Sequence, residues 1–316
     1  MKSQFTVESE TPINLQRHMR TDICTLFEGD YHHGLAALIN SLVTSGYQGR
    51  IWCGYRGPLP DWSAKFFNVG TNIQLHFIEI LPGWHLTHCK PKFMLDLLES
   101  EPNISTLFYF DPDIFVHCKW GFFEQWASEG IALCGDINYI MPTTHPVRMI
   151  WKRWLHAHDL PLVRDFDYYF NGGFLSVSRE QSGFLSKWHT IIQRMETDGI
   201  ELSNFGNGGR DKPFAKTDQD ALNMAVMVTS EALSMMGPEG MDFAEGGFTM
   251  AHAAGATKPW KKSFALEAVG GRRPTRADRE YIKSAAGPVT TFSSLAFAIK
   301  KMNLALGIAI GRFIRS

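Results

Sequence analysis

The first half of the chain combines two hydrophobic patterns. Short apolar runs of strand length cover 22–27, 50–54, 73–80, 106–110 and 131–134. Between them, apolar residues recur every three or four positions over 33–45 and 90–99, which is the period of an amphipathic helix. Strands that alternate with helices are typical of a mostly parallel sheet covered by helices. The pattern therefore predicts an α/β fold for this half.

The second half is less regular. The run 168–177 has the pattern of a strand but contains Asn171, Gly172 and Gly173, and glycines inside a strand indicate a bulge or close approach of the backbone to a ligand. Helical periodicity covers 184–195 and 218–227. The segment 199–216 is rich in glycine, asparagine and charge. Its length favours a functional lid, which we expect to be mobile without ligand and to order over it.

The last part of the chain has the pattern of one more amphipathic helix. From residue 290 onward, apolar residues are spaced by three or four positions, at Phe292, Leu295, Ile299, Met302, Leu306, Ile310 and Phe313. Basic residues flank this stripe at Lys300, Lys301, Arg312 and Arg315. Such a helix can lie on a membrane surface. The alternative is a helix that packs on its own domain or on a partner subunit.

Composition narrows the class of protein. Of 316 residues, 44% are hydrophobic and 20% are charged, so the chain can bury a sizeable core. The formal net charge of −1 gives no reason to expect nucleic acid as a partner. The first 20 residues are polar and lack the apolar core of a secretory signal. No run of about 18 uncharged apolar residues indicates a membrane span.

The cysteines point to a reducing compartment. The five are scattered and mostly lie in strand-like runs, at Cys24, Cys53, Cys89, Cys118 and Cys134. They show no C-x-x-C spacing, so we interpret them as reduced core residues rather than disulfides or zinc ligands. We therefore expect a cytoplasmic protein, with peripheral contact to the cytoplasmic membrane face as an option for the C-terminal helix.

Two carboxylates stand at the end of an apolar, aromatic strand. The run 106–110 is followed by Asp111, Pro112 and Asp113, and then by further apolar residues. An unpaired buried carboxylate is costly, and ligands of α/β proteins bind at the carboxyl ends of strands. Asp111 and Asp113 are therefore candidate ligands of a hard divalent metal that holds a phosphate-bearing substrate. The alternative is a solvated turn, because both residue types are common in turns.

Three further segments favour the metal site. They are Phe170-Asn171-Gly172-Gly173-Phe174-Leu175, Thr217-Asp218-Gln219-Asp220-Ala221-Leu222-Asn223 and His252-Ala253-Ala254-Gly255-Ala256-Thr257-Lys258-Pro259-Trp260. With the Asp-Pro-Asp segment, and in this order, they resemble the retaining glycosyltransferases of family 8, the GT-A group that includes glycogenin-like and bacterial lipooligosaccharide galactosyltransferases. The last segment matches the family's His-x-x-Gly-x-x-Lys-Pro-Trp pattern at every fixed position. The resemblance covers about residues 22–262 and omits the C-terminal tail.

The resemblance implies a fold and a domain organisation. We expect a GT-A type nucleotide-sugar-binding fold, with a mixed, mostly parallel central sheet. On this basis, 1–20 is a polar tail, 21–265 is the catalytic domain and 266–316 is a C-terminal helical appendage. The nucleotide-binding half of the catalytic domain would run from about 21 to 136, and the acceptor half from about 137 to 265.

The resemblance also implies a metal site. In the family, both aspartates of the Asp-x-Asp motif and the histidine of the late motif bind a divalent ion, and here these are Asp111, Asp113 and His252. Two carboxylates and an imidazole suit Mn²⁺ better than Mg²⁺. The ion holds the diphosphate of a UDP-sugar, to which Asp111 also contributes, and stabilises the leaving group. Lys258 would reach the diphosphate, and Gly255 would let the backbone approach it.

Other candidate residues each have a plainer alternative. Donor-sugar contacts of the family correspond to Asp136, Asn171 and Gly172. Asp136 could instead be the N-cap of a helix or a solvated residue at the end of a loop, and Asn171 could be part of a bulge. Asp218 and Gln219 would lie beside the anomeric carbon and the acceptor, so that Gln219, Asp218 and Asp136 are the candidate catalytic residues. Asp218 could instead cap its helix, where Asp is favoured.

Three further residues are candidate donor contacts. Asp30 and Tyr31, just after the first strand, resemble the family's uracil-binding turn, although the spacing differs. Lys92 lies on the helix before the metal strand, where family members often carry a base or phosphate contact. A solvated lysine is the alternative there.

The resulting hypothesis is a metal-dependent retaining hexosyltransferase. It would move glucose or galactose from a UDP-sugar to a hydroxyl of a carbohydrate, glycolipid or protein acceptor, in surface polysaccharide or glycoconjugate synthesis. A nucleotidyltransferase would need a Gly-rich phosphate loop near the first strand, and Glu28-Gly29-Asp30 is not one. The other alternative is a non-catalytic nucleotide-sugar-binding scaffold or sensor, which the complete motif set disfavours.

Overall fold

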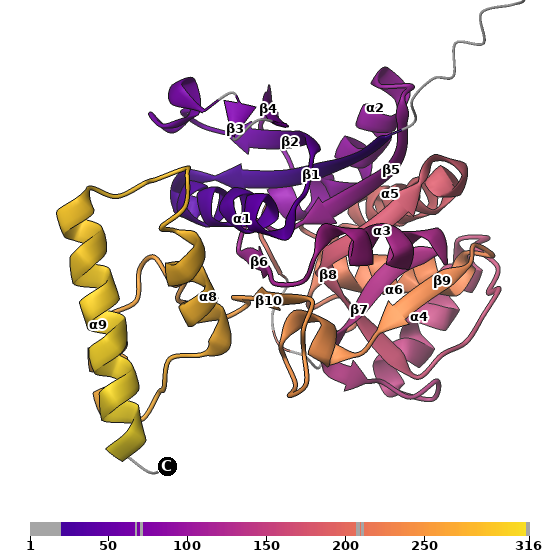
Figure 1. Cartoon of the computed structure of the whole chain (residues 1–316). Coiled ribbons are helices and arrows are strands. Elements are labelled where there is room, and N and C mark those ends of the chain that lie inside the picture. Colours follow the sequence, from indigo (N-terminus) through magenta and orange to yellow (C-terminus); the bar gives the residue numbers. More distant parts are fainter. Residues whose placement is uncertain (1–19, 67, 70–71, 207–208, 210–211, 314–316) are drawn as a thin grey trace, which may run out of the picture.

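The computed structural model describes residues 20–66, 68–69, 72–206, 209 and 212–313, and its centre is a mixed sheet (Figure 1). The predicted polar tail lies outside these residues, except for Arg20. The strand order is β3 (Asn68–Val69), β4 (Ile73–Glu79), β2 (Gly49–Arg56), β1 (Arg20–Glu28), β5 (Ile104–Phe110), β8 (Tyr168–Ser178), β7 (Ile131–Ile140) and β9 (Leu233–Met236).

Most neighbouring strands in this sheet are parallel. β4, β2, β1 and β5 all run in one direction, and β7 is parallel to β9. β8 is antiparallel to both of its neighbours, and β3 is antiparallel to β4 at the edge. The mixed, mostly parallel sheet expected from the sequence is therefore confirmed.

Helices cover both faces of the sheet. One layer contains α1 (His32–Ser45) and α3 (Trp120–Ser128). The other contains α2 (Lys90–Ser100), α4 (Pro146–Ala157), α5 (Ser182–Thr197) and α6 (Thr217–Val228). Side chains alternate along a strand, so β5 places Leu107 and Tyr109 in the second layer and Phe108 and Phe110 in the first. Helices bury the side chains on both faces of this strand, which is why its apolar run is continuous.

A smaller unit connects the sheet to the C-terminal extension. The short strands β6 (Ile114–Val116) and β10 (Met250–His252) pair antiparallel. The extension consists of α7 (Phe264–Val269), α8 (Arg276–Ser284) and α9 (Ser294–Phe313). Its own core, which includes Trp260, Phe264 and Tyr281, packs against Ala37 of α1 and Phe115 of β6.

Two parts of the fold differ from the elements predicted from the sequence. β7 continues to Ile140, so Gly135 and Asp136 lie inside a strand; the expectation that the strand ends before them is wrong. The helices α3, α4, α7 and α8 were not predicted. Aromatic residues obscure the period of α3, and α4 begins with Pro146 at its first position. α8 does carry a local signal, the capping box of Thr275 and Asp278.

The predicted tail helix is present as α9. Its inner face, with Leu304, Gly307 and Gly311, is buried against the rest of the chain, so this face packs on its own domain as one interpretation proposed. α9 is also long and apolar enough, by length and composition alone, to cross a membrane, which the sequence analysis did not anticipate. Only 17% of its 18-residue window is buried, so most of the helix surface faces solvent.

Candidate functional site

The candidate site lies where β1 and β5 end. These strands are parallel, so the turn after β1, with Asp30 and Tyr31, and the turn after β5, with Asp111 and Asp113, leave the sheet at the same edge. β8 lies on the other side of β5, and its register places Phe174 opposite Phe110. The backbone N–H of Asp111 continues this ladder by donating to Gly173 O at 2.7 Å.

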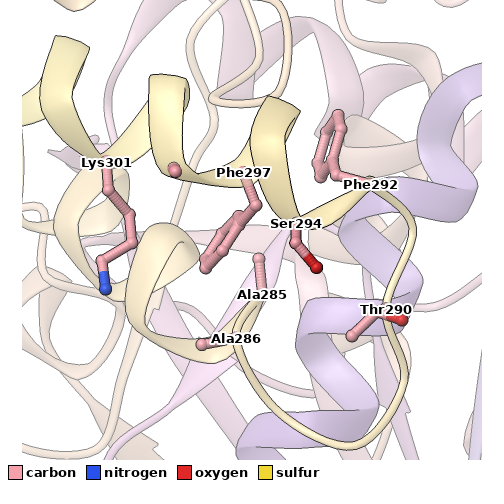
Figure 2. Close-up of a pocket in the computed structure, with 8 residues that line it drawn as sticks. Ala285, Ala286, Thr290, Phe292, Ser294, Phe297 and Lys301 are labelled. Carbon is pink, nitrogen blue, oxygen red and sulfur yellow. The ribbon is translucent and has the colours of Figure 1, made fainter.

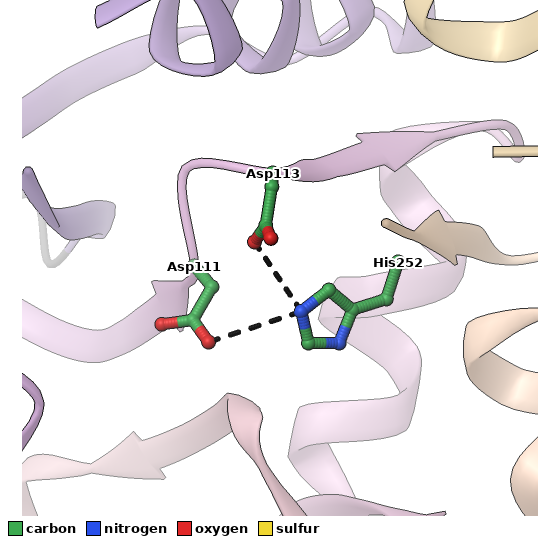
Figure 3. A group of neighbouring side chains, drawn as sticks. All are labelled: Asp111, Asp113 and His252. Carbon is green, nitrogen blue, oxygen red and sulfur yellow. Dashed lines mark ion pairs between the residues drawn. The ribbon is translucent and has the colours of Figure 1, made fainter. Parts of the chain in front are cut away.

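The small β6–β10 ladder brings His252 to the two carboxylates. Its register pairs His252 with Ile114, the residue after Asp113. His252 Nε2 lies 3.3 Å from Asp113 Oδ1 and 3.9 Å from Asp111 Oδ2 (Figure 3). One ligand atom from each of the three residues lies within 4.8 Å of the other two. The structure therefore brings the three predicted metal ligands together.

Glycines leave room around this cluster. A Cβ atom on Gly173 would lie 2.7 Å from His252 Cε1 and 2.9 Å from Asp111 Oδ2. A Cβ atom on Gly34 of α1 would lie 2.5 Å from Pro112 O and 2.7 Å from the Trp260 ring. The glycines noted inside β8 correspond to both features that the sequence indicated. The β7–β8 register shifts between the Leu133–Leu175 and Gly135–Phe170 pairs, and the candidate metal ligands approach Gly173 closely.

Two lysines, the buried Lys90 and the half-buried Lys258, pair with the carboxylates. Lys258 Nζ donates to Asp113 Oδ2 at 2.7 Å and to Ala253 O at 2.9 Å. Lys90 Nζ, on the first residue of α2, lies 3.1 Å from Asp111 Oδ1 and 3.3 Å from Asp218 Oδ2. Lys90 also donates to Gly172 O at 2.8 Å. Such pairing is what allows charged groups to stay buried.

Lys90 is a functional candidate that the sequence analysis missed. The predicted residue, Lys92, is exposed and forms an ion pair with Asp96 on the outer face of α2, away from the cluster. The apolar stripe of α2 includes Phe93 and Met94, three and four positions after Lys90. Lys90 therefore lies in line with that stripe, and this helical spacing is the signal that could have identified it.

The charges shift the pKa values of these groups in opposite directions. Burial alone would raise the pKa of the Asp113 carboxyl, but His252 and Lys258 outweigh it and hold the pKa below its usual value. Burial alone would lower the pKa of Lys90, but Asp111 and Asp218 raise it. The pKa of Lys258 is likewise raised, because Asp113 outweighs its burial. All three groups are therefore charged at neutral pH.

A second polar network lies beside the lysines and joins β7, β8 and α6. Asn171 Nδ2 donates to Asp136 Oδ2 at 2.6 Å, and Gln219 Nε2 donates to the same oxygen at 3.2 Å. Gln219 Oε1 accepts from Gly172 N at 2.9 Å. All of these side chains are buried. The structure thus brings together Asp136, Asn171, Gly172, Asp218 and Gln219, as the resemblance implied.

The cap alternative for Asp218 is not what the structure shows. Lys216 occupies the N-cap of α6, and the Asp218 side chain is buried against Lys90. Asp220, which the sequence analysis left without a role, is buried too. It accepts from the Tyr169 hydroxyl at 2.6 Å and from Lys216 N at 3.0 Å, and burial raises its pKa to about 7.

The predicted uracil-binding turn lies beside the late motif. Asp30 Oδ2 accepts from Trp260 Nε1 at 2.9 Å and pairs with Lys261 at 2.6 Å. The Tyr31 ring packs edge-on against the Trp260 ring and faces Lys258 Nζ at 5.7 Å. Gly255 is exposed in the loop before Lys258. The turn after β1 and the loop after β10 therefore form one continuous wall of the site.

The residues present fit a divalent metal. Two carboxylates and one imidazole form a mixed oxygen and nitrogen donor set, which suits Mn²⁺. The absence of a side chain at Gly173 leaves space directly beside His252 and Asp111. Asp111, Asp113 and His252 would hold the ion, while Lys90 and Lys258 balance the remaining charge.

The predicted lid is described in part. Its first residues are anchored, since Leu202 is buried and its carbonyl accepts from His85 N at 2.7 Å. Near its end, the Pro213 carbonyl accepts from the Trp151 indole. Residues 207–208 and 210–211 lie outside the described residues. Mobility and closure of this segment stay a prediction.

Comparison with known proteins shows similarity in fold only. No protein-family model matches the chain, and no curated protein sequence matches it. Solved structures do match. The bifunctional glycosyltransferase WbbM, in its apo form, aligns with a TM-score of 0.57 at 13% identity, over 93% of this chain. The chain spans 53% of WbbM, about half of its length.

Two further glycosyltransferases have the same fold. The galactosyltransferase LgtC, solved with donor and acceptor sugar analogues, aligns with a TM-score of 0.51 at 16% identity, over 88% of this chain and 99% of LgtC. GlyE of Streptococcus pneumoniae TIGR4 aligns with a TM-score of 0.51 at 12% identity, over 90% of this chain and 64% of GlyE. The chain therefore has the GT-A type fold that the resemblance implied.

Proposed function

We propose that this chain is a metal-dependent retaining glycosyltransferase of the family 8 type. It transfers a hexose, glucose or galactose, from a UDP-sugar to a hydroxyl of a carbohydrate, glycolipid or protein acceptor. The observation that carries the proposal is the convergence of Asp111, Asp113 and His252, with Lys258 beside them, at the carboxyl edge of a GT-A type sheet. The role belongs to surface polysaccharide or glycoconjugate synthesis on the cytoplasmic side.

The wall of the site suits a nucleoside diphosphate. Lys258 provides a half-buried cation beside the proposed metal ligands, where a diphosphate would carry its negative charge. Tyr31 and Asp30 form the neighbouring turn, where an aromatic face and a carboxylate can contact a base. A divalent ion at the three ligands supplies charge stabilisation for the departing diphosphate.

The second polar network suits the transferred sugar. The carboxylate of Asp136 is held by two amides, of Asn171 and Gln219, so its position is set before a sugar arrives. Lys90 holds the Asp218 carboxylate and the Gly172 carbonyl in place by donating a hydrogen bond to each. Preorganised acceptors of this kind can hold hexose hydroxyls without further rearrangement.

Asp218 is ion-paired with buried Lys90, which makes it a weak nucleophile. Front-side attack is therefore favoured. The bond between the anomeric carbon and the phosphate oxygen breaks, the acceptor oxygen bonds to that carbon on the same face, and the acceptor proton passes to the leaving phosphate. The protein contributes position and electrostatics to this reaction.

Donor binding and hydrolysis test the proposal. UDP with Mn²⁺ should raise the melting temperature clearly more than GDP or CMP with Mn²⁺, because ligands that bind only the folded state stabilise it. UDP-glucose or UDP-galactose should be hydrolysed slowly with Mn²⁺, and a chelator should stop the reaction. Binding of UDP without any hydrolysis or transfer would favour the scaffold alternative.

Asp113→Asn provides the matched test of the metal site. It removes one metal ligand and the partner of Lys258, so we expect loss of Mn²⁺-dependent UDP binding and at least about a hundredfold loss of hydrolysis, with the protein still folded. Asp96→Asn, on the surface of α2, is the control and should hydrolyse donor like the wild type. Full activity of Asp113→Asn in chelator would overturn the proposal.

A further inference from the structure

α9 presents an apolar stripe to solvent. Its members, which are 54–87% exposed, are Leu295, Ile299, Met302, Leu306 and Phe313. Their spacing of three, four or seven positions puts them on one face of the helix. Leu266 and Val269 of α7, which packs against α9, are also exposed. α9 stands at the outer edge of the molecule, in yellow in Figure 1.

The extension that carries this stripe has a charge opposite to that of the rest of the chain. Residues 266–316 contain nine basic and three acidic residues, a net charge of +6, so residues 1–265 carry −7 of the total of −1. The chain has no acidic residue after Glu280. An apolar stripe in a strongly basic segment is the composition of helices that bind anionic lipid surfaces.

At the surface of the extension, basic side chains are more exposed than acidic ones. Exposed basic side chains of the extension are Arg272, Arg273, Arg276, Arg279, Lys283, Lys301 and Arg312. Its acidic side chains are covered to different degrees. Asp278 is buried under Lys262, Glu280 pairs with His117 and Lys283, and Glu267 is half-buried. Of the exposed cations, Arg276 pairs with Asp242 and Lys283 with Glu280, whereas Lys301 and Arg312 belong to α9 itself. The extension as a whole therefore presents more cationic than anionic side chains to solvent.

We propose that α9 docks on an anionic phospholipid surface and lies in its plane, with the apolar stripe inserted among the acyl chains. A second copy of the chain fits this face less well, since the exposed cations of both copies would repel each other. A membrane supplies both an apolar interior and phosphate groups, which match the stripe and the cations together. The docking does not depend on the proposed transferase activity.

The inner face of α9 argues for an in-plane rather than a spanning helix. Gly307 allows contact with Phe264, because a Cβ there would lie 2.7 Å from Phe264 O. Asn303 Oδ1 accepts from Phe264 N at 2.6 Å, and Lys300 Nζ donates to Trp260 O at 2.6 Å. A spanning α9 would lose all of these contacts and would bury both Lys300 and Lys301 in lipid, which is costly.

A hollow at the start of α9 adds a polar recess beside the stripe. It measures about 400 Å³ and lies between the end of α8, the loop that follows and the first turns of α9 (Figure 2). Phe292 and Phe297 line it together with the hydroxyl residues Thr290 and Ser294 and with Lys301. Figure 2 shows Lys301 at one end of this hollow and Ser294 and Thr290 toward the other, so the hollow adds polar groups next to the stripe.

Co-sedimentation of the full chain with vesicles tests the proposal. We expect binding to mixed phosphatidylcholine–phosphatidylglycerol vesicles and about tenfold weaker binding, or more, to pure phosphatidylcholine. Ile299→Glu with Leu306→Glu should weaken binding by about a hundredfold, because two inserted side chains are lost. Both positions are exposed, so an unchanged melting temperature should show that the fold persists.

The matched control is Leu162→Glu, which changes a leucine that is 46% exposed in the segment after α4. α4 lies on the opposite side of the molecule from α9 in Figure 1. This variant should bind vesicles like the wild type. A protease site added after Ser316 should stay cleavable on vesicles that meet the protein from outside, as an in-plane helix requires.

Three results would overturn the proposal. The first is equal binding, or none, to the two kinds of vesicle. The second is wild-type binding by the double glutamate variant, which would place the contact elsewhere. The third is a dimer in sedimentation equilibrium that the double variant dissociates, without vesicle binding, which would make a second copy the occupant. Protection of the added protease site would contradict the in-plane orientation.

Discussion

At the scale of single residues, the buried lysine at the start of α2 links the proposed metal ligands to the second polar network. Lys90 contacts Asp111, Asp218 and the Gly172 carbonyl, and is 2% exposed. At this depth, water cannot take the place of the Lys90 ammonium group if that group is removed. The carboxylates of Asp111 and Asp218 therefore depend on this cation, whereas Lys92 is exposed and pairs with Asp96 on the surface.

Replacing each lysine with methionine separates these roles. Lys90→Met leaves two carboxylates near each other without their shared cation, so we expect it to lower the free energy of unfolding by about 3–5 kcal/mol. Lys92→Met should change it by about 0.5 kcal/mol or less. Urea unfolding measures both. Equal stability of the two variants would show that the Lys90 ion pairs are not important to the fold.

Asp220 gives a pH prediction. Its pKa is raised from 3.8 to about 7 by burial, so the folded state favours the protonated carboxyl. Below pH 4 both states are protonated. As the pH rises from about 4 to 7, the unfolded state loses this proton first, and the free energy of unfolding should fall by up to about 4 kcal/mol.

Asp220→Asn should remove this component of the pH dependence, because asparagine does not titrate. Urea unfolding at several pH values between 4 and 8 measures it, as the difference between variant and wild type. Other buried acids, such as Asp22, contribute equally to both proteins. Asp96→Asn should keep the wild-type slope, as a surface control. The same slope in Asp220→Asn would contradict the assignment.

At the scale of elements, α1 connects the candidate site to the C-terminal extension. Its first turns carry Gly34, which contacts Pro112 and Trp260. Its middle carries Asn40, which is 1% exposed and binds the last residue of α8 and the loop after it through three hydrogen bonds. Asn40 Nδ2 donates to Ser284 O and to Val289 O, both at 2.8 Å, and Asn40 Oδ1 accepts from Val289 N at 2.9 Å.

Asn40→Ala should loosen this connection. It removes the side-chain partners of the buried Val289 N–H and C=O, while Ser284 O keeps its bond from Gly287 N, so we expect a loss of about 2–4 kcal/mol in the free energy of unfolding. Hydrogen exchange at the Val289 N–H should accelerate as well. Thr44→Ala is the control, since its hydroxyl bonds only to Asn40 O within α1. Unchanged exchange at Val289 would show that other contacts hold the loop.

At the scale of the whole molecule, the extension supports the site while it offers a surface to the membrane. Trp260 links the two. It donates to Asp30 in the turn after β1, and its carbonyl accepts from Lys300 of α9. One face of α9 is thus part of the domain core, and the opposite face is free for docking.

Truncation and surface substitution should therefore have different effects. Removal of residues 290–316 exposes Phe264 and breaks the Lys300 bond to Trp260, so we expect a lower melting temperature and weaker UDP binding with Mn²⁺. Ile299→Glu with Leu306→Glu should leave both unchanged, because these side chains point outward. Calorimetry with UDP measures the difference. If the truncated chain binds UDP as strongly as the wild type, the extension is not needed to support the site.

Much of this molecule is determined locally, by the sequence alone. The strands β1, β2, β4 and β5, the start of β7, the helices α1, α2, α5, α6 and α9, and the position of Asp111 and Asp113 after a strand all follow from periodicity, which reports short-range backbone geometry. The late motif with His252 and Lys258 and the network residues Asn171 and Gln219 were identified by their resemblance to a family, and the structure brings them together.

Only the tertiary structure decided how these residues meet. Lys258 and Asp113 are 145 positions apart, and the β6–β10 ladder that joins their segments has three residues in each strand, too few for a pattern. The inclusion of Asp136 within β7 depends on pairing with β8, and the choice of Lys90 over Lys92 depends on which face of α2 is covered. Long-range packing sets these contacts, and no local spacing encodes it.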